Sequence, residues 1–545
     1  MVLYTTVHRM SDRINRRDYL QWMGIGGAAL LAGCTGSGAD VDVPDEGDNV
    51  LIIAEQESPG TMNPIMLDTF EGFVTNRLTY SALTWTDSDF NVQPDLATDW
   101  ESNEAADQWT FELREGVTFN HNGNEVLAED VKATIDKIQD PDTGSPGAGS
   151  IGPIESTEII DDHSVQFTLS EPFSQLPLTL SFGWAQIIEQ DAIENRWDEI
   201  GSNSFGSGPF ELDEFVRGEQ MRVTAADDFY FETEDGEPLP LLDGVTQVII
   251  PDSSARTNAL EQGDVDLIRR MNAREFDRVD GTDGVETVEV DGGRAYPIIM
   301  NHDIEPFDDN RVRQAVKYAI NGEEIMQVAQ LGAGAVGESQ TPIGPANFNY
   351  AADLEPDYGT TAQVDQARDL LEDAGYGDGI ELDFPLYFAP DFAAQIRETG
   401  VLVQEQLGEA GIEFDLQEVT WDNYLAEVEG VAEFYVGTHP MWAIERQAMF
   451  ILLHQDGSWN GVNWDGDSYD AFEEALDGAL STSDEAEVQA SYAEAQQLIH
   501  EHAGYVVPFF ADAIAGHRSS VQGFRMDPEK TRIYAARGDS PISIE

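Results

Sequence analysis

Two short segments bring histidines or carboxylates close enough together to suggest a metal site. His500, Glu501 and His502 are consecutive, whereas a metal-binding helix needs both histidines on one of its faces. Asp465-Gly466-Asp467 begins like a calcium loop, but Leu476 stands where such a loop carries its bidentate glutamate. The motifs GxxxxGK[ST], HExxH and GxSxG are absent from the sequence. These patterns predict no catalytic residues, no bound metal and no cofactor.

A stretch rich in tryptophan and histidine, 421–460, is the strongest candidate for a binding surface. It contains Trp421, Tyr424, His439, Trp442 and Trp459. Aromatic walls with a few placed polar groups are what a pocket for a small ligand needs. The same rings could also serve ordinary core packing, and the sequence leaves both interpretations open.

The first 34 residues predict export and a lipid anchor. Arg16 and Arg17 precede a short apolar run, as in a twin-arginine signal peptide, and the run is too short to cross about 30 Å of hydrocarbon. The run ends Leu31-Ala32-Gly33-Cys34, which resembles a lipobox. We therefore expect lipid on Cys34, the only cysteine, with a free thiol as the alternative. Residues 35–49 are rich in Gly and Asp and predict a flexible acidic linker.

The charge balance points to a salty environment. Asp and Glu total 104 against 28 Lys and Arg, for a net charge of −76. The acids run evenly through segments with apolar periodicity, which indicates a folded acidic surface and not a disordered tail. Self-repulsion at this charge destabilises a fold in dilute buffer, and molar salt screens it. Nucleic acid is excluded as a partner because the sequence has no basic patch.

Strand-like and helix-like patterns alternate through the mature chain. Apolar residues at Val312, Ala315, Val316, Ala319 and Ile320 give one face of a helix. Such alternation without a repeat predicts mixed α/β lobes. The expected strands are 50–54, 109–113, 164–169, 245–250, 381–388, 412–419 and 506–510, and the expected helices are 128–135, 310–320, 364–374, 399–410 and 492–500.

Nine segments together identify a family resemblance. They are 94–100 (PDLATDW), 109–123 (WTFELREGVTFNHNG), 128–131 (AEDV), 206–210 (GSGPF), 251–267 (PDSSARTNALEQGDVDL), 300–301 (MN), 306–315 (PFDDNRVRQA), 370–376 (LLEDAGY) and 492–496 (YAEAQ). In this order and spacing the chain resembles the extracellular solute-binding proteins of family 5, the dipeptide, oligopeptide and nickel receptors of ABC importers. With its charge and lipobox, it resembles a haloarchaeal lipoprotein of that family.

The resemblance implies a fold and a partner set. The fold is α/β, a two-lobed periplasmic-binding-protein-like fold of type II in its large family 5 variant, with a ligand cleft between the lobes. The implied division is a signal peptide with lipobox over 1–34, a linker over 35–49, lobe I over 50–297 plus 508–545, and lobe II over 298–507. The implied protein is a monomer that binds a peptide or small molecule on the outer face of the membrane. Separate chains would supply the permease and the ATPase.

Three regions are expected to face the cleft by this resemblance. The first follows the opening strand and contains Glu55, Glu57, Thr61 and Asn63. The second contains Tyr387, Phe388 and Asp391. The third contains the aromatic stretch, and its expected ligand contacts are Trp421, Tyr424, His439, Trp442, Glu445, Arg446 and Trp459.

The sequence departs from the family's dipeptide pattern. Dipeptide-binding members hold the amine with an Asp in the loop matching 438–446 and the carboxylate with an Arg near 387–392. Here these loops read THPMWAIER and YFAPDF, without either residue in place. Peptides, sugars and chelated metals all remain open as ligands. A surface-anchored ligand sensor with no transport role is the alternative function.

The charge balance leads to a test of salt dependence. We expect the protein to lose its fold below about one molar salt, because weaker screening exposes the self-repulsion of its carboxylates. Circular dichroism during a salt titration measures this. A spectrum unchanged down to millimolar salt would refute the halophilic interpretation.

Overall fold

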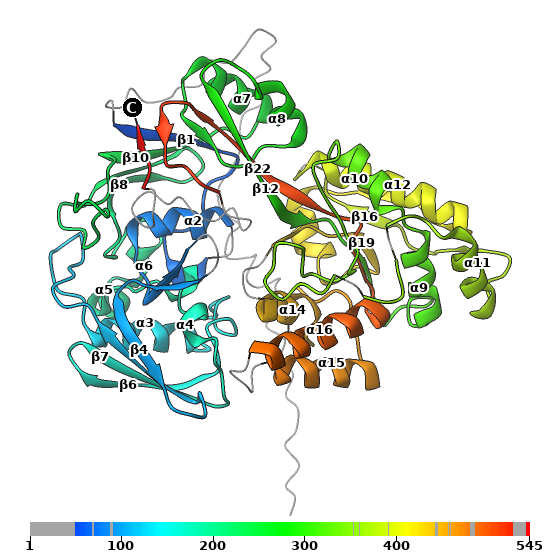
Figure 1. Cartoon of the computed structure of the whole chain (residues 1–545), viewed down its shortest axis with the longest axis horizontal. Coiled ribbons are helices and arrows are strands. Elements are labelled where there is room, and N and C mark those ends of the chain that lie inside the picture. The colour runs from blue at the N-terminus through cyan, green and yellow to red at the C-terminus, as the bar shows by residue number, and fades with distance from the viewer. Residues whose placement is uncertain are drawn as a thin grey trace, which may run out of the picture.

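The computed structural model describes residues 49–67, 70–87, 91–352, 354–358, 360–390, 392–441, 445–455, 457, 459–479, 485–526 and 541–544. The export and lipidation residues Arg16, Arg17 and Cys34 lie outside the described residues, as do Asp391 and Trp442. Figure 1 shows two halves, with the blue-to-green elements on one side and the yellow-to-orange helices on the other. The long strands β12 and β22 run between them.

A nine-stranded sheet forms the frame of the first half. Its first strand, β1, turns Leu51 and Ile53 toward one apolar cluster and Ile52 and Ala54 toward another on the opposite face. This period of two is why both sheet faces are covered. The order is β20-β12-β22-β11-β1-β10-β9-β8, and β14 pairs with β22. The bounds are β1 Val50–Glu55, β8 Phe210–Val216, β9 Gln220–Ala225, β10 Gly244–Ile249, β11 Leu267–Ile268, β12 Val285–Ala295, β14 Gly334–Val336, β20 His439–Pro440 and β22 Phe509–Arg518.

A four-stranded antiparallel sheet and several helices complete this half. Trp109, Phe111 and Leu113 alternate inward along the second strand and bury against α3. The sheet consists of β4 (Ala97–Ser102), β5 (Gln108–Leu113), β7 (Ser164–Leu169) and β6 (Ile154–Asp161). The helices are η1 (Pro64–Met66), α2 (Phe70–Thr79), α3 (Ala128–Gln139), α4 (Leu176–Thr179), η2 (Gly183–Ala185), α5 (Gln190–Asn195), α6 (Trp197–Ile200), α7 (Ser253–Gln262) and α8 (Ala273–Val279).

A five-stranded sheet forms the frame of the second half. Its order is β18 (Leu416–Glu418), β16 (Leu386–Phe388), β19 (Phe434–Val436), β13 (Ile298–Met300) and β21 (Tyr505–Val506). Its helices are α9 (Asn310–Ala319), α10 (Gly322–Ala329), α11 (Val364–Asp373), α12 (Ala394–Ala410), α13 (Trp421–Asn423), the π-helical turn η3 (Tyr424–Val428), α14 (Glu445–Leu453), α15 (Asp467–Gly478) and α16 (Glu485–His502). The minor strands are β2 (Thr84–Thr86), β3 (Val92–Pro94), β15 (Ile380–Glu381), β17 (Ile412–Glu413), β23 (Val521–Gln522) and β24 (Ser543–Ile544).

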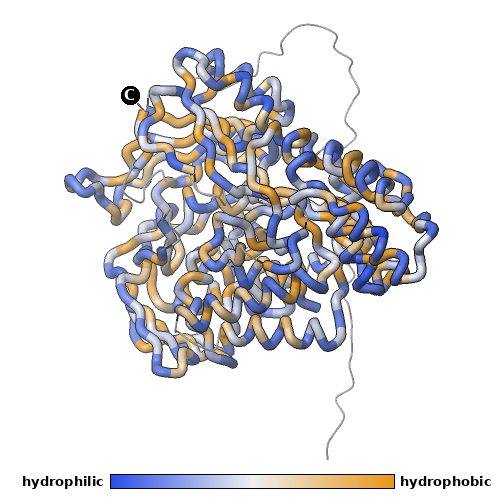
Figure 2. Tube along the Cα trace, turned by 45° about the vertical axis from the view of Figure 1, so that its right-hand side comes forward, coloured by the Kyte–Doolittle hydropathy of each residue, from blue (hydrophilic) through white to orange (hydrophobic). Residues whose placement is uncertain are grey.

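Periodicity predicted the helices of this half better than its strands. The apolar face expected from Val312 to Ala319 is buried along α9, which confirms that helix. The single strand expected over 381–388 is instead split into β15 and β16. Pro385 lies in the gap, where a residue without an N–H cannot continue the hydrogen-bond ladder. Figure 2 shows the result, with hydrophobic stretches inside both halves and hydrophilic ones at their outer edges.

The only lysine of α9 ties that helix to the end of α16. Lys317 is fully buried, and its Nζ donates to the carbonyl oxygens of Ile499 (3.3 Å) and His500 (2.6 Å). Arg313 donates to the carbonyl of His502 at 2.9 Å. Cations at the last carbonyls of a helix stabilise its end. Burial lowers the pKa of Lys317 well below its usual value. These contacts fix the start of β21, which follows at once.

The chain passes between the two large sheets by a direct connection of two residues at three closely spaced places. It crosses from β12 to β13 at 296–297, from β19 to β20 at 437–438, and from β21 to β22 at 507–508. The amide of Gly437 donates to the carbonyl of Pro297 at 2.7 Å, and Gly337 donates to Pro508 at 3.0 Å. The crossings are therefore hydrogen-bonded to their surroundings.

Gly337 offers a test of how tightly one crossing is packed. A Cβ at this position would lie 1.9 Å from the carbonyl oxygen of Val507. We expect Gly337→Ala to lower the free energy of unfolding by about 1–3 kcal/mol or more, because the backbone must shift. Gly408→Ala is the control, since it meets nothing within 4 Å inside α12 and should raise stability by about 1 kcal/mol. Urea unfolding in molar salt measures both, and an equal effect of the two substitutions would contradict the packing described.

Candidate functional site

Four aromatic rings form a continuous ladder next to the passage from β19 to β20. The ring centroids of Phe392 and Trp421 lie 4.2 Å apart, and Trp421 stacks on Tyr424 at 5.2 Å with 10° between the ring planes. Tyr424 meets Tyr435 edge-on at 6.0 Å. Trp421 and Tyr424 stack because three residues of helical backbone place them on one face. Phe392 and Trp421 are half-buried, so the ladder has an accessible end.

Two arginines from the nine-stranded sheet lie over the accessible end of this ladder. The guanidinium carbon of Arg294, on β12, is 5.3 Å from the centroid of Phe392, and that of Arg270, just after β11, is 6.0 Å away. Arg294 also donates to the hydroxyl of Thr438 at 3.0 Å. A guanidinium has five N–H donors in a planar fork, so it can stack on a ring and hold a carboxylate at once. This end of the ladder is a cationic, aromatic surface.

A buried polar cluster lies at the opposite end of the ladder. Oε1 of Glu429 is 3.7 Å from Nε2 of His439, and both residues are almost fully buried. Nδ1 of His439 is 2.7 Å from the hydroxyl of Tyr505. Burial holds the pKa of Tyr505 well above its usual value, so this hydroxyl keeps its proton and can donate to Nδ1. That arrangement leaves the second ring nitrogen of His439 facing the carboxylate of Glu429.

The ladder therefore separates two groups of opposite charge. Arg270 and Arg294 lie at the Phe392 end, and Glu429 lies beyond Tyr424. Burial and, to a smaller extent, the charge of Glu429 raise the pKa of Tyr424 well above its usual value. The attraction between opposite charges is strong in a buried site because the local dielectric constant is low. The arrangement offers a cationic surface to an acid at its accessible end and places a carboxylate at its buried end.

The region after β1 is built mainly for structure. Nε of Arg269 donates to Oε1 of Glu55 at 2.6 Å, and the ion pair is buried. The side-chain oxygen of Asn63 caps η1 by accepting from the backbone amide of Ile65 at 3.1 Å. The backbone amide of Asn63 donates to the hydroxyl of Thr61. These contacts give Glu55, Asn63 and Thr61 structural partners. Glu57 is half-buried in the loop between them.

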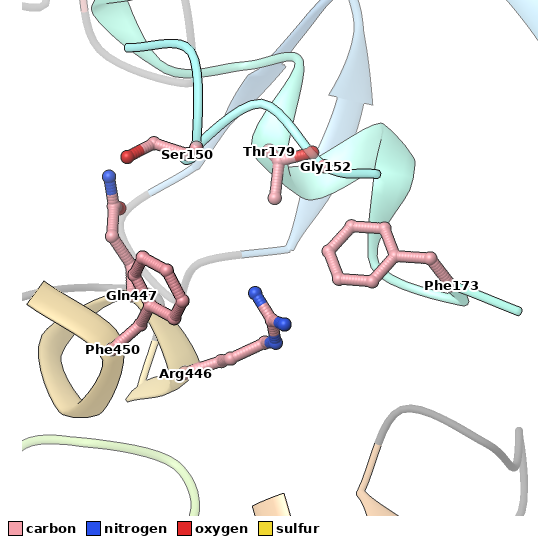
Figure 3. A pocket seen from close by; sticks show the side chains of 8 residues that line it. Ser150, Gly152, Phe173, Thr179, Arg446, Gln447 and Phe450 are labelled. Atoms are coloured by element: carbon pink, nitrogen blue, oxygen red, sulfur yellow. The ribbon is translucent and has the colours of Figure 1, made fainter. Parts of the chain in front are cut away.

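The first turn of α14 lies at the boundary between the two halves. Glu445 is buried and accepts from the amide of Asn349 at 3.1 Å, and burial raises its pKa. The guanidinium of Arg446 lies 5.8 Å from the ring of Phe173 and 5.6 Å from that of Phe450. Figure 3 shows Arg446 and Gln447 pointing from α14 toward the segment of Ser150 and Gly152. These side chains line a small recess that is open at its mouth and whose inner space has room for about one water-sized group.

The remaining predicted contacts that the structure describes lie on a strand of the five-stranded sheet, in the core of the second half, and after α14. Tyr387 pairs with Tyr435 between β16 and β19 and is half-buried. Phe388 is a core residue of the second half. Trp459 is half-buried, and its amide donates to the carbonyl of Ile451 at 3.1 Å. Asp391, from the second predicted region, and Trp442, from the aromatic stretch, lie outside the described residues.

Sequence reasoning missed the arginines and the glutamine of the site. Arg270 and Arg294 lie more than 90 residues before Phe392, and only the paired strands bring them together. Gln447 has no motif around it. One signal was available for the arginines, because they are two of only 28 Lys and Arg residues in a strongly acidic chain, but no strand was expected near either of them.

Two further features are absent from the part of the chain that the structure describes. No group of three or more His, Cys, Asp or Glu side chains in that part is arranged to hold a metal ion. Within the same part of the chain, every helix is too short or too polar to cross a bilayer.

Comparison with known proteins places the chain in a family. The family described as bacterial extracellular solute-binding proteins, family 5 Middle, matches residues 91–461. The glutathione-binding protein GsiB of Escherichia coli (strain K12) is 26% identical over 532 residues, covering 95% of this chain and 98% of the relative. The dipeptide-binding protein of the same strain is 25% identical over 514 residues, covering 88% and 92%.

Solved structures share the whole fold. The ABC transporter-associated periplasmic binding protein DppA from Helicobacter pylori, in complex with the peptide STSA, has a TM-score of 0.78 and 25% identity, covering 91% of this chain and 98% of that one. The oligopeptide-binding protein AppA from Bacillus subtilis, in complex with a nonapeptide, has a TM-score of 0.75 at 23% identity, covering 88% and 96%. The second likeness concerns the fold alone.

Proposed function

The chain belongs to the bacterial extracellular solute-binding proteins of family 5, and on that premise we propose that its ligand is a short peptide or another small zwitterion. As a member it is the substrate-binding receptor of an ABC importer, which delivers a solute to the permease and is not an enzyme. The output of such a receptor is binding free energy and a change of shape.

The ladder with opposite charges at its two ends carries this proposal. Arg270 and Arg294 suit a carboxylate lying over Phe392, and Glu429 suits a cation near Tyr424. The apolar faces of Phe392 and Trp421 suit the part of the ligand between its charges. A peptide with free ends has this charge pattern. Relatives named for glutathione, for dipeptides and for the bound peptide STSA support this ligand class.

The carboxylate partner differs from the one that the dipeptide resemblance implies. Phe392 and not an arginine ends the YFAPDF segment, and cations from the opposite sheet lie over its ring. The first half would therefore hold the acid of the ligand, and the second half would supply the aromatic wall. A ligand held from both sides favours the closed arrangement of the halves.

We also propose the lobe division and the hinge. Lobe I comprises 50–297 plus 508–545, lobe II comprises 298–507, and the connectors at 296–297 and 507–508 flex as the cleft closes. The two sheet crossings at these residues support the division. The contact of Arg274 with Glu398, 3.2 Å apart, would close the cleft near the hinge.

The anchor and the environment belong to the same proposal. The twin-arginine pair Arg16-Arg17 would export the chain, and lipid on Cys34 would hold it at the outer face of the membrane as a monomer. The charge of −76 supports a halophilic source. Mass spectrometry of the mature N-terminus would detect the lipid.

The ligand class is tested by binding in molar salt. Native mass spectrometry identifies any solute that co-purifies, and calorimetry then compares peptide acids with their C-terminal amides.

We expect Trp421→Ala to weaken peptide binding at least tenfold, or about 1.4 kcal/mol, because it removes the centre of the ladder. Arg294→Gln should weaken binding of the acids more than of the amides. Trp442→Ala should also weaken binding more than folding.

Trp100→Ala is the matched control. Trp100 is a half-buried tryptophan on β4, stacked 6.1 Å from Phe111 and remote in sequence from the ladder. It should change stability but not peptide affinity. Equal affinity of the wild type and Trp421→Ala for every peptide that binds would contradict the proposed site.

A further inference from the structure

The recess beside α14 is walled by both halves of the molecule. Ser150, Gly152, Phe173 and Thr179 come from the first half, and Arg446, Gln447 and Phe450 come from the second. The first wall is held tightly, because a Cβ on Gly147 would lie 2.5 Å from Trp184 and one on Gly152 would lie 3.2 Å from Phe173. A wall with so little freedom presents its side chains in one geometry.

Gln447 is the unexplained group in this recess. It is 5% exposed, yet neither its amide nitrogen nor its amide oxygen has a hydrogen-bond partner among the described residues. Gln496, on α16, is also buried, but it donates to the carbonyls of Asn349 at 2.7 Å and Tyr492 at 3.1 Å while accepting from the amide of Ala351 at 3.0 Å. A buried amide without partners costs about 1–3 kcal/mol. Gln447 therefore points to a guest that completes its hydrogen bonds.

Arg446 adds a cation to the same recess. Its guanidinium lies between the rings of Phe173 and Phe450, and its buried Nε has no partner within the described part of the chain. Phe450 is itself held by stacking on His454 at 4.3 Å. The aromatic rings hold the guanidinium plane in position, so that its N–H groups are fixed donors.

The recess offers donors from two side chains. Arg446 and the amide nitrogen of Gln447 can donate, and the amide oxygen of Gln447 can accept. The hydroxyl of Thr179 is already engaged with the carbonyls of Ile151 at 3.1 Å and Leu176 at 3.0 Å. Such a set favours an acyl oxygen, from either a carboxylate or a carboxamide. The inner space has room for about one water-sized group, which fits an oxygen and not a side chain.

We propose that this recess is a second subsite, which takes an acyl oxygen at the far end of an extended ligand. The inference rests on the proposed function, because it assumes a peptide-like ligand in the cleft. The recess follows the predicted contact loop directly, since Met441 is buried at one end of that loop and α14 begins at Glu445. A ligand that starts at the aromatic ladder would reach Gln447 only if it is long enough.

Stability provides the first arm of the test. Gln447→Met keeps the length of the side chain and removes an unpaired amide, so the thermal midpoint of the ligand-free protein should stay the same or rise. Gln496→Met is the matched control and should lower the midpoint by several degrees, because it breaks three hydrogen bonds. A comparable loss in Gln447→Met would show that its amide serves the fold, and would overturn the inference.

Binding provides the second arm. Calorimetry compares alanine peptides of two to five residues, as acids and as C-terminal amides, on the wild type and on Gln447→Met. For the wild type, the affinity should rise at least tenfold when one particular residue is added to the peptide. Gln447→Met should lack that rise, and it should bind the shorter peptides with the same affinity as the wild type. A larger loss for acids than for amides in Arg446→Gln would identify a carboxylate, and equal losses would identify a carbonyl.

The two proposals fail in different ways in this experiment. A wild type that binds none of the peptides overturns the proposed ligand class, and the second subsite with it. A wild type that binds peptides without a step in affinity, or a Gln447→Met variant that keeps the step, overturns the second subsite alone.

Discussion

Two guanidinium groups from one half of the molecule lie over an aromatic ring of the other half, and the rest of the proposed binding site extends from this contact. Arg270 and Arg294 meet Phe392, which continues through Trp421 and Tyr424 toward a buried carboxylate. A cation–π contact of this kind contributes about 0.5–2 kcal/mol, depending on how dry it is. Because its two sides belong to different sheets, the contact exists only when the halves are close together.

The acidic surface makes the few internal cations more informative. A chain with net charge −76 repels anions at long range, and salt screens that repulsion beyond a few ångströms. Recognition of an acid must then come from guanidinium groups at close range, inside the protein, where screening is weak. Arg269 is paired with Glu55, whereas Arg270 and Arg294 face the aromatic ladder. In the proposed site, the local position of these two arginines would therefore favour an acidic ligand group even though the molecule as a whole is strongly negative.

Local patterns predicted the fold well and the site only in part. The helix at Asn310–Ala319 follows from an apolar period of 3.6, and the opening strand follows from a short continuous apolar run. Both patterns are properties of neighbouring residues. Trp421 and Tyr424 could be found because aromatic residues concentrate along one stretch. Arg294 and Gln447 could not, since the first needs the pairing of β12 with β22 and the second needs the approach of the two halves. The break at Pro385 was readable from the sequence but was overlooked.

The central claim is that two α/β halves close around a guest and reopen. Small-angle X-ray scattering in molar salt measures it directly, on protein stripped of ligand by partial unfolding and refolding and then given a peptide that calorimetry shows to bind. The account predicts a smaller radius of gyration with the peptide and a return to the larger value after its removal. A radius that stays constant while calorimetry reports binding would contradict it.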